Sequence, residues 1–241
     1  MNNNSAKQSY FVAGTDTDAG KTLISCALLA KAKANGLTTA AVKPVAAGCH
    51  ETPDGLRNDD ALMLMEQCSV PLYYEQVNPV AFAPAIAPHI AAQTLGKRMQ
   101  VDRLSGFCRG VTMQGAQFTL IEGAGGWRVP VNERETLADL AKLLNHPIIL
   151  VVGMRLGCIN HALLTVEAIV NDGLNLAGWV ANCVDPNMSV LNANIDTLVQ
   201  RINAPLLGVV PSLSHDLDHA AKVQIAQQHL DLNMLTPKSR D

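Results

Sequence analysis

The stretch Gly14-Thr15-Asp16-Thr17-Asp18-Ala19-Gly20-Lys21-Thr22 is typical of a phosphate-binding loop. It follows the apolar run Tyr10-Phe11-Val12-Ala13, which predicts a buried strand, and it precedes residues 23–30, whose apolar side chains recur at helical spacing. In such a loop the glycines let the backbone approach a ligand, and the N–H groups of the helix N-terminus face phosphate oxygens. Lysine neutralises the terminal phosphates, and the threonine hydroxyl reaches Mg²⁺. The stretch therefore predicts a nucleotide site that uses Lys21 and Thr22.

The spacing within this loop has one irregularity. Five residues separate Gly14 from Gly20, so the strict Walker pattern would begin at Thr15 instead. A glycine-rich turn before a helix can also be an ordinary connection between two elements that binds no ligand. The preceding strand, the following helix and the adjoining Asp16-Thr17-Asp18 favour the nucleotide site.

Composition excludes several classes of protein. The chain has 241 residues, 48% of them hydrophobic and 16% charged, with a formal net charge of −3. This is enough for one large core, and no linker divides it, so we expect a single domain. Residues 1–8 are expected to form a polar N-terminal tail, and residues from about 231 to 241 a C-terminal tail. Mild acidity without runs of Lys or Arg argues against a nucleic-acid partner.

Cysteine usage and hydropathy indicate a cytoplasmic protein. The six cysteines have no C-x-x-C spacing, which favours reduced thiols. The first nine residues lack the apolar core of a signal peptide. No apolar run approaches the ~18 residues of a membrane span, so we expect no membrane partner.

The remaining pattern alternates strands with helices. We expect strands at residues 10–13, 38–42, 118–121, 147–152, 176–181 and 206–210, and helices at about 23–30, 59–67, 101–114, 136–144, 160–171, 190–202 and 217–230. Residues 45–58 are expected to form a loop, and residues 76–89, with three prolines, an irregular extended crossing. The alternation predicts an α/β fold, a predominantly parallel β-sheet flanked by helices on both faces.

Chemically useful residues recur where the expected strands end. They are Gly14, Lys43, Glu122, Gly153, Asn182 and Pro211. The carboxyl ends of parallel strands share one edge of an open sheet, which is where ligands bind. These residues, far apart in sequence, are therefore expected to lie close together.

Several of these residues also have a plain structural interpretation. Glu122 and Asp60 are candidate Mg²⁺ ligands, but Glu122 could lie on a solvated surface and Asp60 could cap a helix. Lys43 could be a second cation near phosphates or an ordinary surface lysine. The turn at residues 153–161 suits a carboxylate at a helix N-terminus, or it is a simple connector. No histidine has metal-ligand spacing and no Ser/His/Asp or Cys/His triad is evident, so the site suits phosphoryl transfer by positioning and charge.

Four segments, taken in order, resemble the dethiobiotin synthetase family. They are residues 14–22, Lys43-Pro44-Val45-Ala46, Glu122-Gly123-Ala124-Gly125-Gly126-Trp127 and Leu156-Gly157-Cys158-Ile159-Asn160-His161-Ala162. The resemblance covers about residues 10–213. It implies a homodimeric P-loop enzyme of biotin synthesis that carboxylates 7,8-diaminononanoate with CO₂ and closes the ureido ring through a carbamic-phosphoric anhydride. MgATP is consumed, and dethiobiotin, ADP and phosphate are the products.

The resemblance also implies roles for residues. Lys21, Lys43 and Thr17 would be catalytic, and Thr22, Asp60 and Glu122 would hold Mg²⁺. The nucleotide would contact Asp18, Ala19, Gly20, Lys21 and Thr22, with Asn182, Pro211 and Leu213 around adenine. The diamine would contact Thr17, Lys43 and Gly125, and its carboxylate would meet Leu156, Gly157, Cys158, Ile159 and Asn160 of the neighbouring subunit.

The sequence departs from the family pattern at two positions. Ala47 stands where the family often has serine, and Asp18 replaces the more usual glutamate. An ATP-driven switch acting on a protein partner and an ATP-dependent ligase for another substrate are the alternatives. Related switches commonly carry a second lysine within the loop, and residues 15–19 have none, which favours the enzyme.

Overall fold

One parallel sheet organises the chain, and the computed structural model describes residues 7–235 of it. Its strands are β1 (Gln8–Gly14), β2 (Thr39–Val42), β7 (Phe118–Glu122), β8 (Ile148–Gly153), β9 (Leu176–Asn182) and β10 (Leu206–Val210). They pair in the order β10-β9-β8-β1-β7-β2, and every pair is parallel. Most of the strand residues are buried, as expected of a sheet covered on both faces.

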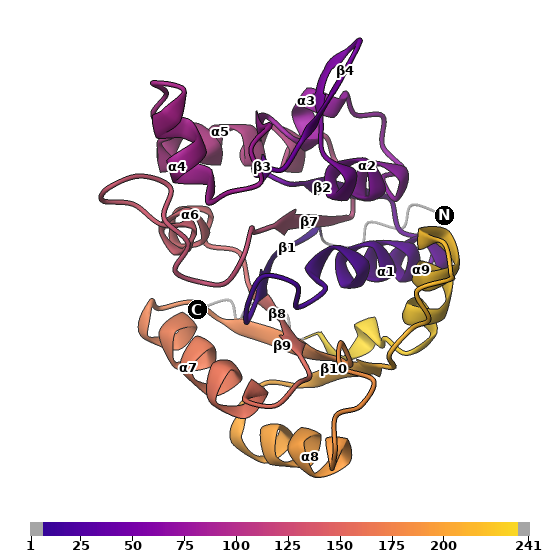
Figure 1. Cartoon of the computed structure of the whole chain (residues 1–241). Helices are drawn as coiled ribbons and strands as arrows, with labels where there is room; N and C mark the ends of the chain where they lie inside the picture. Colours follow the sequence, from indigo (N-terminus) through magenta and orange to yellow (C-terminus); the bar gives the residue numbers. More distant parts are fainter. Residues whose placement is uncertain (1–6, 236–241) are drawn as a thin grey trace.

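Helices cover both faces of this sheet (Figure 1). One face carries α1 (Lys21–Ala34), α2 (Asp59–Glu66) and α9 (His219–Gln228); the other carries α5 (Val101–Thr112), α6 (Leu137–Leu144), α7 (Cys158–Asn171) and α8 (Leu191–Arg201). Successive residues of β1 supply both cores, because strand side chains alternate in direction: Val12 packs with α1, and Phe11 packs with α5 and α6. The expected fold class is confirmed.

Two segments are more regular than the sequence suggests. The expected loop at residues 45–58 contains β3 (Val45–Ala47) and the hairpin of β4 (His50–Thr52) and β5 (Gly55–Arg57). The expected irregular crossing at residues 76–89 contains β6 (Val80–Phe82), which pairs with β3, and it runs from α3 (Tyr74–Val77) into α4 (Pro88–Thr94). Three-residue strands are too short to establish a period. Pro88 begins α4, where a missing N–H costs nothing.

Regular structure extends into both segments that were expected to be tails. Gln8 already belongs to β1, and a 3₁₀ helix at Leu232–Met234 leads to the buried Leu235. Residues 1–6 and 236–241 lie outside the described residues. None of the helices in residues 7–235 has the length and apolar character needed to cross a bilayer.

Strand order decides which loops meet. β1 lies between β7 and β8, and β2 lies on the other side of β7. Val12 is opposite Glu122 and Gly14 is opposite Val151, while Gly153 at the end of β8 is opposite Asn182 at the end of β9. The loop after β1 therefore has the ends of β7 and β8 on either side, as the convergence of strand-end residues predicts.

Candidate active site

The loop between β1 and α1 is held in place by its neighbours. Gly20 has φ +83° and is the N-cap of α1, and a side chain there would clash with the Asn182 amide. Glycine alone satisfies both conditions. Asn182 Nδ2 donates a hydrogen bond to the Ala19 carbonyl at 2.9 Å. Lys21 Nζ lies within the loop, donating to the Asp16 carbonyl at 3.0 Å.

The extra residue of this loop is accommodated by an unusual backbone conformation at its tip. Asp18 has φ +58°, in the left-handed region that non-glycine residues seldom adopt. Arg155, two residues beyond β8, donates from Nη2 to the Thr17 carbonyl at 3.3 Å. Sequence reasoning missed Arg155, because nothing in its neighbourhood reveals which loop lies beside it.

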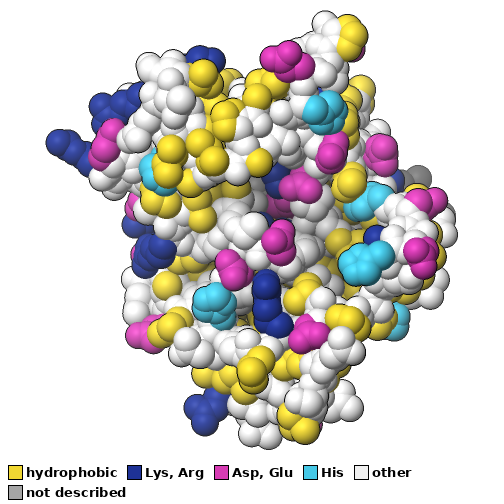
Figure 2. Space-filling view, in the orientation of Figure 1, with side chains coloured by type: hydrophobic (Ala, Val, Ile, Leu, Met, Phe, Trp, Pro, Cys, Tyr) yellow, Lys and Arg dark blue, Asp and Glu magenta, His cyan; other side chains and the backbone are white. Residues whose placement is uncertain are grey.

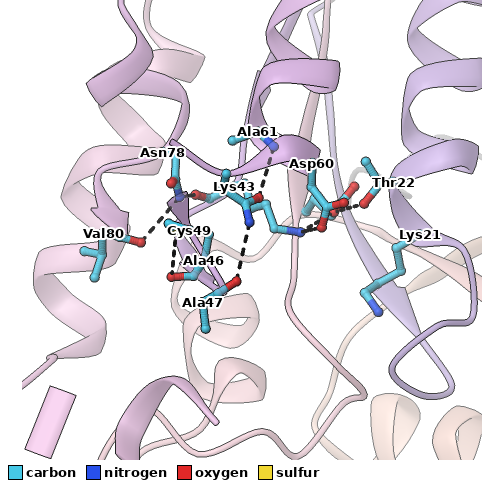
Figure 3. A network of polar contacts seen from close by, with 12 residues as sticks. Lys21, Thr22, Lys43, Ala46, Ala47, Cys49, Asp60, Ala61, Asn78 and Val80 are labelled. Atoms are coloured by element: carbon cyan, nitrogen blue, oxygen red, sulfur yellow. Dashed lines mark hydrogen bonds and ion pairs between the residues drawn. The ribbon is translucent and has the colours of Figure 1, made fainter. Parts of the chain in front are cut away.

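A buried ionic cluster joins the loop to the ends of β2 and β7. Lys43 Nζ contacts Asp60 Oδ2 at 2.6 Å and Glu122 Oε1 at 2.8 Å. The same Glu122 oxygen accepts a hydrogen bond from Thr22 Oγ1 at 2.9 Å. Glu122 is 0% exposed and Lys43 5%, so the surface interpretation of both residues is wrong. Figure 3 shows Lys43 reaching toward Asp60 and Thr22, with Lys21 nearby.

Burial and mutual attraction set the charges of this cluster. Burial alone would lower the pKa of Lys43, but Glu122 and Asp60 outweigh it and hold that pKa above its usual range. Burial pushes the Asp60 pKa up, and Lys43 reverses this, so the pKa of Asp60 lies below its usual value. Burial lowers the pKa of Lys21, an effect that Glu122 partly offsets. Lys43 and Asp60 therefore remain a charged pair at neutral pH.

The donor set fits a small divalent cation. Glu122 Oε2 is buried without a hydrogen-bond partner, although its sister oxygen has two. A buried carboxylate oxygen is seldom left without a partner, and this one lies on the carboxylate that also binds the Thr22 hydroxyl. Residues 7–235 contain no group of three or more His, Cys, Asp or Glu side chains able to hold a metal. Carboxylate and hydroxyl oxygens, together with phosphate oxygens, are the ligands that Mg²⁺ commonly takes in nucleotide sites.

Asp60 is not the cap of α2. Asn58 is the N-cap, and its side chain accepts a hydrogen bond from Ala61 N at 3.2 Å. Asp60 lies in the first turn, where its carboxylate points to Lys43. The capping alternative was right about the position of the helix start and wrong about the residue.

Because Asn58 caps α2 and Asp60 contacts Lys43, substitutions of these two residues should have different outcomes. Asp60→Asn should leave the melting temperature nearly unchanged, because Lys43 keeps Glu122, and should weaken Mg²⁺-dependent ATP binding at least about tenfold. Asn58→Ala removes the cap and should cost about 1 kcal/mol of stability. Thermal unfolding and calorimetric titration with ATP, with and without Mg²⁺, check both. Unaltered metal dependence in a folded Asp60→Asn protein would return Asp60 to a structural role.

The cluster opens into a cavity of about 760 Å³. It is lined by Thr17, Asp18, Gly20, Lys21, Thr22, Lys43, Ala46, Ala47, Asn58, Asp60, Ala85, Ile86, Ala87, Pro88, Ala124, Gly125, Arg128, Val129 and Pro130. Charged groups come from the loop, the end of β2, helix α2 and the segment after β7, whereas β3 and the segment before α4 supply apolar side chains. Figure 2 shows acidic and basic side chains within a hollow near the centre of this face, beside hydrophobic ones. Such a cavity suits a small molecule with a polar end and an alkyl body.

Some residues that line the cavity were not predicted from the sequence. Asn58, Ile86 and Arg128 line the cavity, and none was among the expected contacts. The prolines around Ile86 marked a long crossing of the kind that often carries function, and this was the available signal. Thr17, Lys43 and Gly125 line the cavity as expected.

Two groups of expected contacts lie outside the cavity. Asn182 ends β9, while Pro211 and Leu213 follow β10 on the far side of the loop from Lys43. The segment at residues 156–160 leads into α7, which begins at Cys158, and Leu156 is 95% exposed. This segment does not line the cavity of its own chain.

The parallel sheet, the Gly-Lys-Thr loop beneath α1 and the buried acid at the end of β7 define a P-loop nucleotide-binding protein. A family model described as "AAA domain" matches residues 8–220. ATP-dependent dethiobiotin synthetase BioD of Cellvibrio japonicus is 61% identical, over 95% of this chain and 98% of its own length. The same-named proteins of Pseudomonas aeruginosa and Marinobacter nauticus are 58% and 50% identical, covering 94% and 95% of this chain and 97% and 98% of their own. The chain belongs to the ATP-dependent dethiobiotin synthetase family.

Solved structures of more distant proteins share the fold alone. The MinC:MinD cell division complex of Aquifex aeolicus matches with a TM-score of 0.57 at 11% identity, covering 92% of this chain and 91% of the other. A ParA family ATPase of Chlorobium tepidum has a TM-score of 0.54 at 12% identity with the same coverages. These likenesses confirm the P-loop fold and say nothing about substrate.

Proposed function

We propose that this chain is an ATP-dependent dethiobiotin synthetase acting on 7,8-diaminononanoate and CO₂. The observation that carries the proposal is the cluster of buried Lys43 and Glu122 with Thr22, which lies at a partly apolar cavity that the phosphate loop also lines. The relatives that carry that name match the chain almost end to end. A phosphate loop and an ionic cluster that line one partly apolar cavity suit a reaction in which ATP phosphorylates a carbamate formed on a diamine.

The reaction requires two transfers in the same cavity. One amine of the diamine adds to CO₂ and loses a proton, which gives a carbamate. A carbamate oxygen attacks the γ-phosphorus, and ADP leaves. The second amine then attacks the carbonyl carbon and loses a proton, phosphate leaves with the anhydride oxygen, and the ureido ring closes. The first two steps move negative charge onto oxygens that the phosphate loop would neutralise.

The chain supplies positioned charge for these steps. Lys21 and Lys43 would neutralise the carbamate and the transferring phosphoryl group, and Thr17 would contact the substrate or the phosphate. Thr22, Asp60 and Glu122 would hold Mg²⁺, which when bound neutralises phosphate oxygens. Fixed charges in a site that excludes water stabilise a transition state without reorganising.

Nucleotide contacts would continue beyond the cavity. Asp18, Ala19 and Gly20 would place backbone groups against the phosphates, and Asn182, Pro211 and Leu213 would surround adenine. Asn182 Nδ2 uses one of its two N–H groups on the Ala19 carbonyl, so its second N–H and its carboxamide oxygen are the groups left for the base. Ala47 lines the cavity with a methyl group, so no hydroxyl is offered there.

Phosphate release from MgATP, measured with and without the diamine and bicarbonate, tests the proposal. Release that depends strictly on both co-substrates is expected, with dethiobiotin formed in equal amount. Release independent of the diamine would overturn the synthetase and favour an ATPase switch. Dependence on a different amine or carboxylate would instead favour a ligase of other specificity.

We further propose that the enzyme is a homodimer in which the segment at residues 156–160 binds the substrate carboxylate of the neighbouring subunit. Support comes from the exposed Leu156 and from the position of this segment at the N-terminus of a 14-residue helix. The N–H groups of a helix N-terminus and the helix dipole favour a carboxylate there. We also propose one domain, because both hydrophobic clusters pack on one sheet, and a cytoplasmic location, as the free cysteines suit.

Mixing two inactive variants tests the shared site. Lys21→Ala removes the phosphate cation, and Asn160→Asp places a competing carboxylate at the start of α7. In a symmetric dimer each mixed pair contains one site free of both changes, so an equal mixture should regain about a quarter of wild-type activity. Activity no greater than that of the separate variants, in a mixture shown to exchange subunits, would refute a site built by two chains.

A further inference from the structure

A continuous chain of buried polar groups runs behind the ionic cluster. Asn78, 3% exposed, donates from Nδ2 to the Lys43 carbonyl at 2.8 Å. Its Oδ1 accepts a hydrogen bond from the Tyr74 hydroxyl at 3.0 Å, and the same hydroxyl accepts one from Asn58 N at 2.7 Å. Asn58 is the N-cap of α2, the helix that carries Asp60. The chain therefore links the backbone of Lys43 to the helix of its carboxylate partner.

Lys43 is held at both backbone groups by one short element. Its N–H donates to the Val77 carbonyl at 2.7 Å, and its carbonyl accepts from Asn78. Val77 ends α3 and Asn78 is the C-cap. Figure 3 shows Asn78 on the backbone of Lys43, opposite the side chain that reaches Asp60. The last turn of α3 therefore fixes the point from which the Lys43 side chain projects.

The covalent path between the two charged residues does not supply this constraint. Between β2 and α2 the chain makes β3 and the β4–β5 hairpin, and His50 and Glu51 of that hairpin are exposed. The hydrogen-bonded path through Asn78, Tyr74 and Asn58 is shorter and buried. Buried polar networks with every member paired hold their members in one arrangement.

We propose that Asn78 is a positioning residue that sets Lys43 against Asp60, and with them the Mg²⁺ site of the proposed reaction. The inference rests on the metal ligands of the proposed function. Groups behind the direct ligands of a metal commonly change its affinity by about 10–100-fold when removed. Asn78 touches no substrate or metal in this scheme and acts through the residues it orients.

A purely structural role is the competing explanation, and the chain offers a matched control. Asn132 is also a buried asparagine, and its Nδ2 donates to the Met99 carbonyl at 2.9 Å. It lies outside the lining of the cavity. Asn132→Ala should therefore lower the melting temperature much as Asn78→Ala does, without altering the site.

The test measures the affinity for ATP with and without Mg²⁺ and takes the ratio of the two dissociation constants. For Asn78→Ala we expect the gain in affinity from Mg²⁺ to fall about tenfold, and for Asn132→Ala to equal that of wild type. Tyr74→Phe keeps the ring, on which the Arg57 guanidinium stacks 4.2 Å from the centroid, and removes only the hydroxyl. It should move the ratio in the same direction, and it decides the matter if Asn78→Ala does not fold.

The outcomes separate this inference from the function beneath it. A folded Asn78→Ala protein whose ratio equals that of wild type overturns the positioning role and leaves the synthetase untouched. An equal fall in Asn132→Ala also overturns it, because the effect would then follow general loss of stability. A wild-type protein that gains nothing from Mg²⁺ overturns the proposed metal ligands, and the positioning role with them.

Discussion

Replacing Lys21 with alanine is expected to lower kcat by about 10²–10³, the scale of one lost charge contact in a transition state. Lys21 is buried at the start of α1, with Nζ inside the loop that precedes it. The other two cations that line the cavity are held by carboxylates, Lys43 by Glu122 and Asp60 and Arg128 by Asp172, so neither is placed to take over the position of Lys21. Steady-state rates of dethiobiotin formation measure the loss.

The control for this substitution lies on the same helix. Lys31 is in the last turn of α1, at the opposite end from the loop. Lys31→Ala should leave kcat within about twofold of wild type, because its charge is screened and distant from the cavity. A Lys21→Ala enzyme with the wild-type rate would mean that the loop does not bind the transferring phosphate.

The sequence predicted the site where local chemistry is sufficient to define it. The phosphate loop needs only a strand, glycines, Lys21 and Thr22, all contiguous, and it was correctly located. Glu122 and Lys43 were located as strand-end residues, although sequence could not decide whether either was buried. That decision required strand order, because burial of Glu122 follows from β7 lying between β1 and β2.

The remaining differences have one physical origin, which is the shortness of the elements. α3 has four residues and β3 and β6 have three each, so none shows a hydrophobic period. Their positions are set by tertiary contacts such as Asn78 on Lys43. A tertiary contact also decides the role of Asp60. Asn58, two residues earlier, is an equally good capping residue, and only the direction of the Asp60 side chain distinguishes a cap from a partner of Lys43.

Replacing Lys43 with methionine should be costly for both stability and activity. The substitution keeps most of the side-chain volume but leaves Glu122, 0% exposed, without its cation. Breaking one partner from a buried ion pair typically destabilises a protein by about 3–5 kcal/mol, because the other charge stays buried and uncompensated. The same change removes the charge contact that we propose for the transferring phosphoryl group, and it should lower kcat about 10²–10³-fold. Chemical denaturation and steady-state kinetics measure the two losses.

Pairing this substitution with Glu122→Gln separates the two roles of the cluster. In the double variant Lys43→Met/Glu122→Gln, neither of the two buried side chains carries a charge. The double variant should therefore lose less stability than the two single variants added together. Activity should not recover, because both the cation and the carboxylate proposed for Mg²⁺ are gone. Strictly additive losses of stability would mean that Lys43 and Glu122 do not depend on each other in the folded protein. Recovered activity would mean that the chemistry does not use this pair, and the cluster would then be a structural feature of the sheet edge.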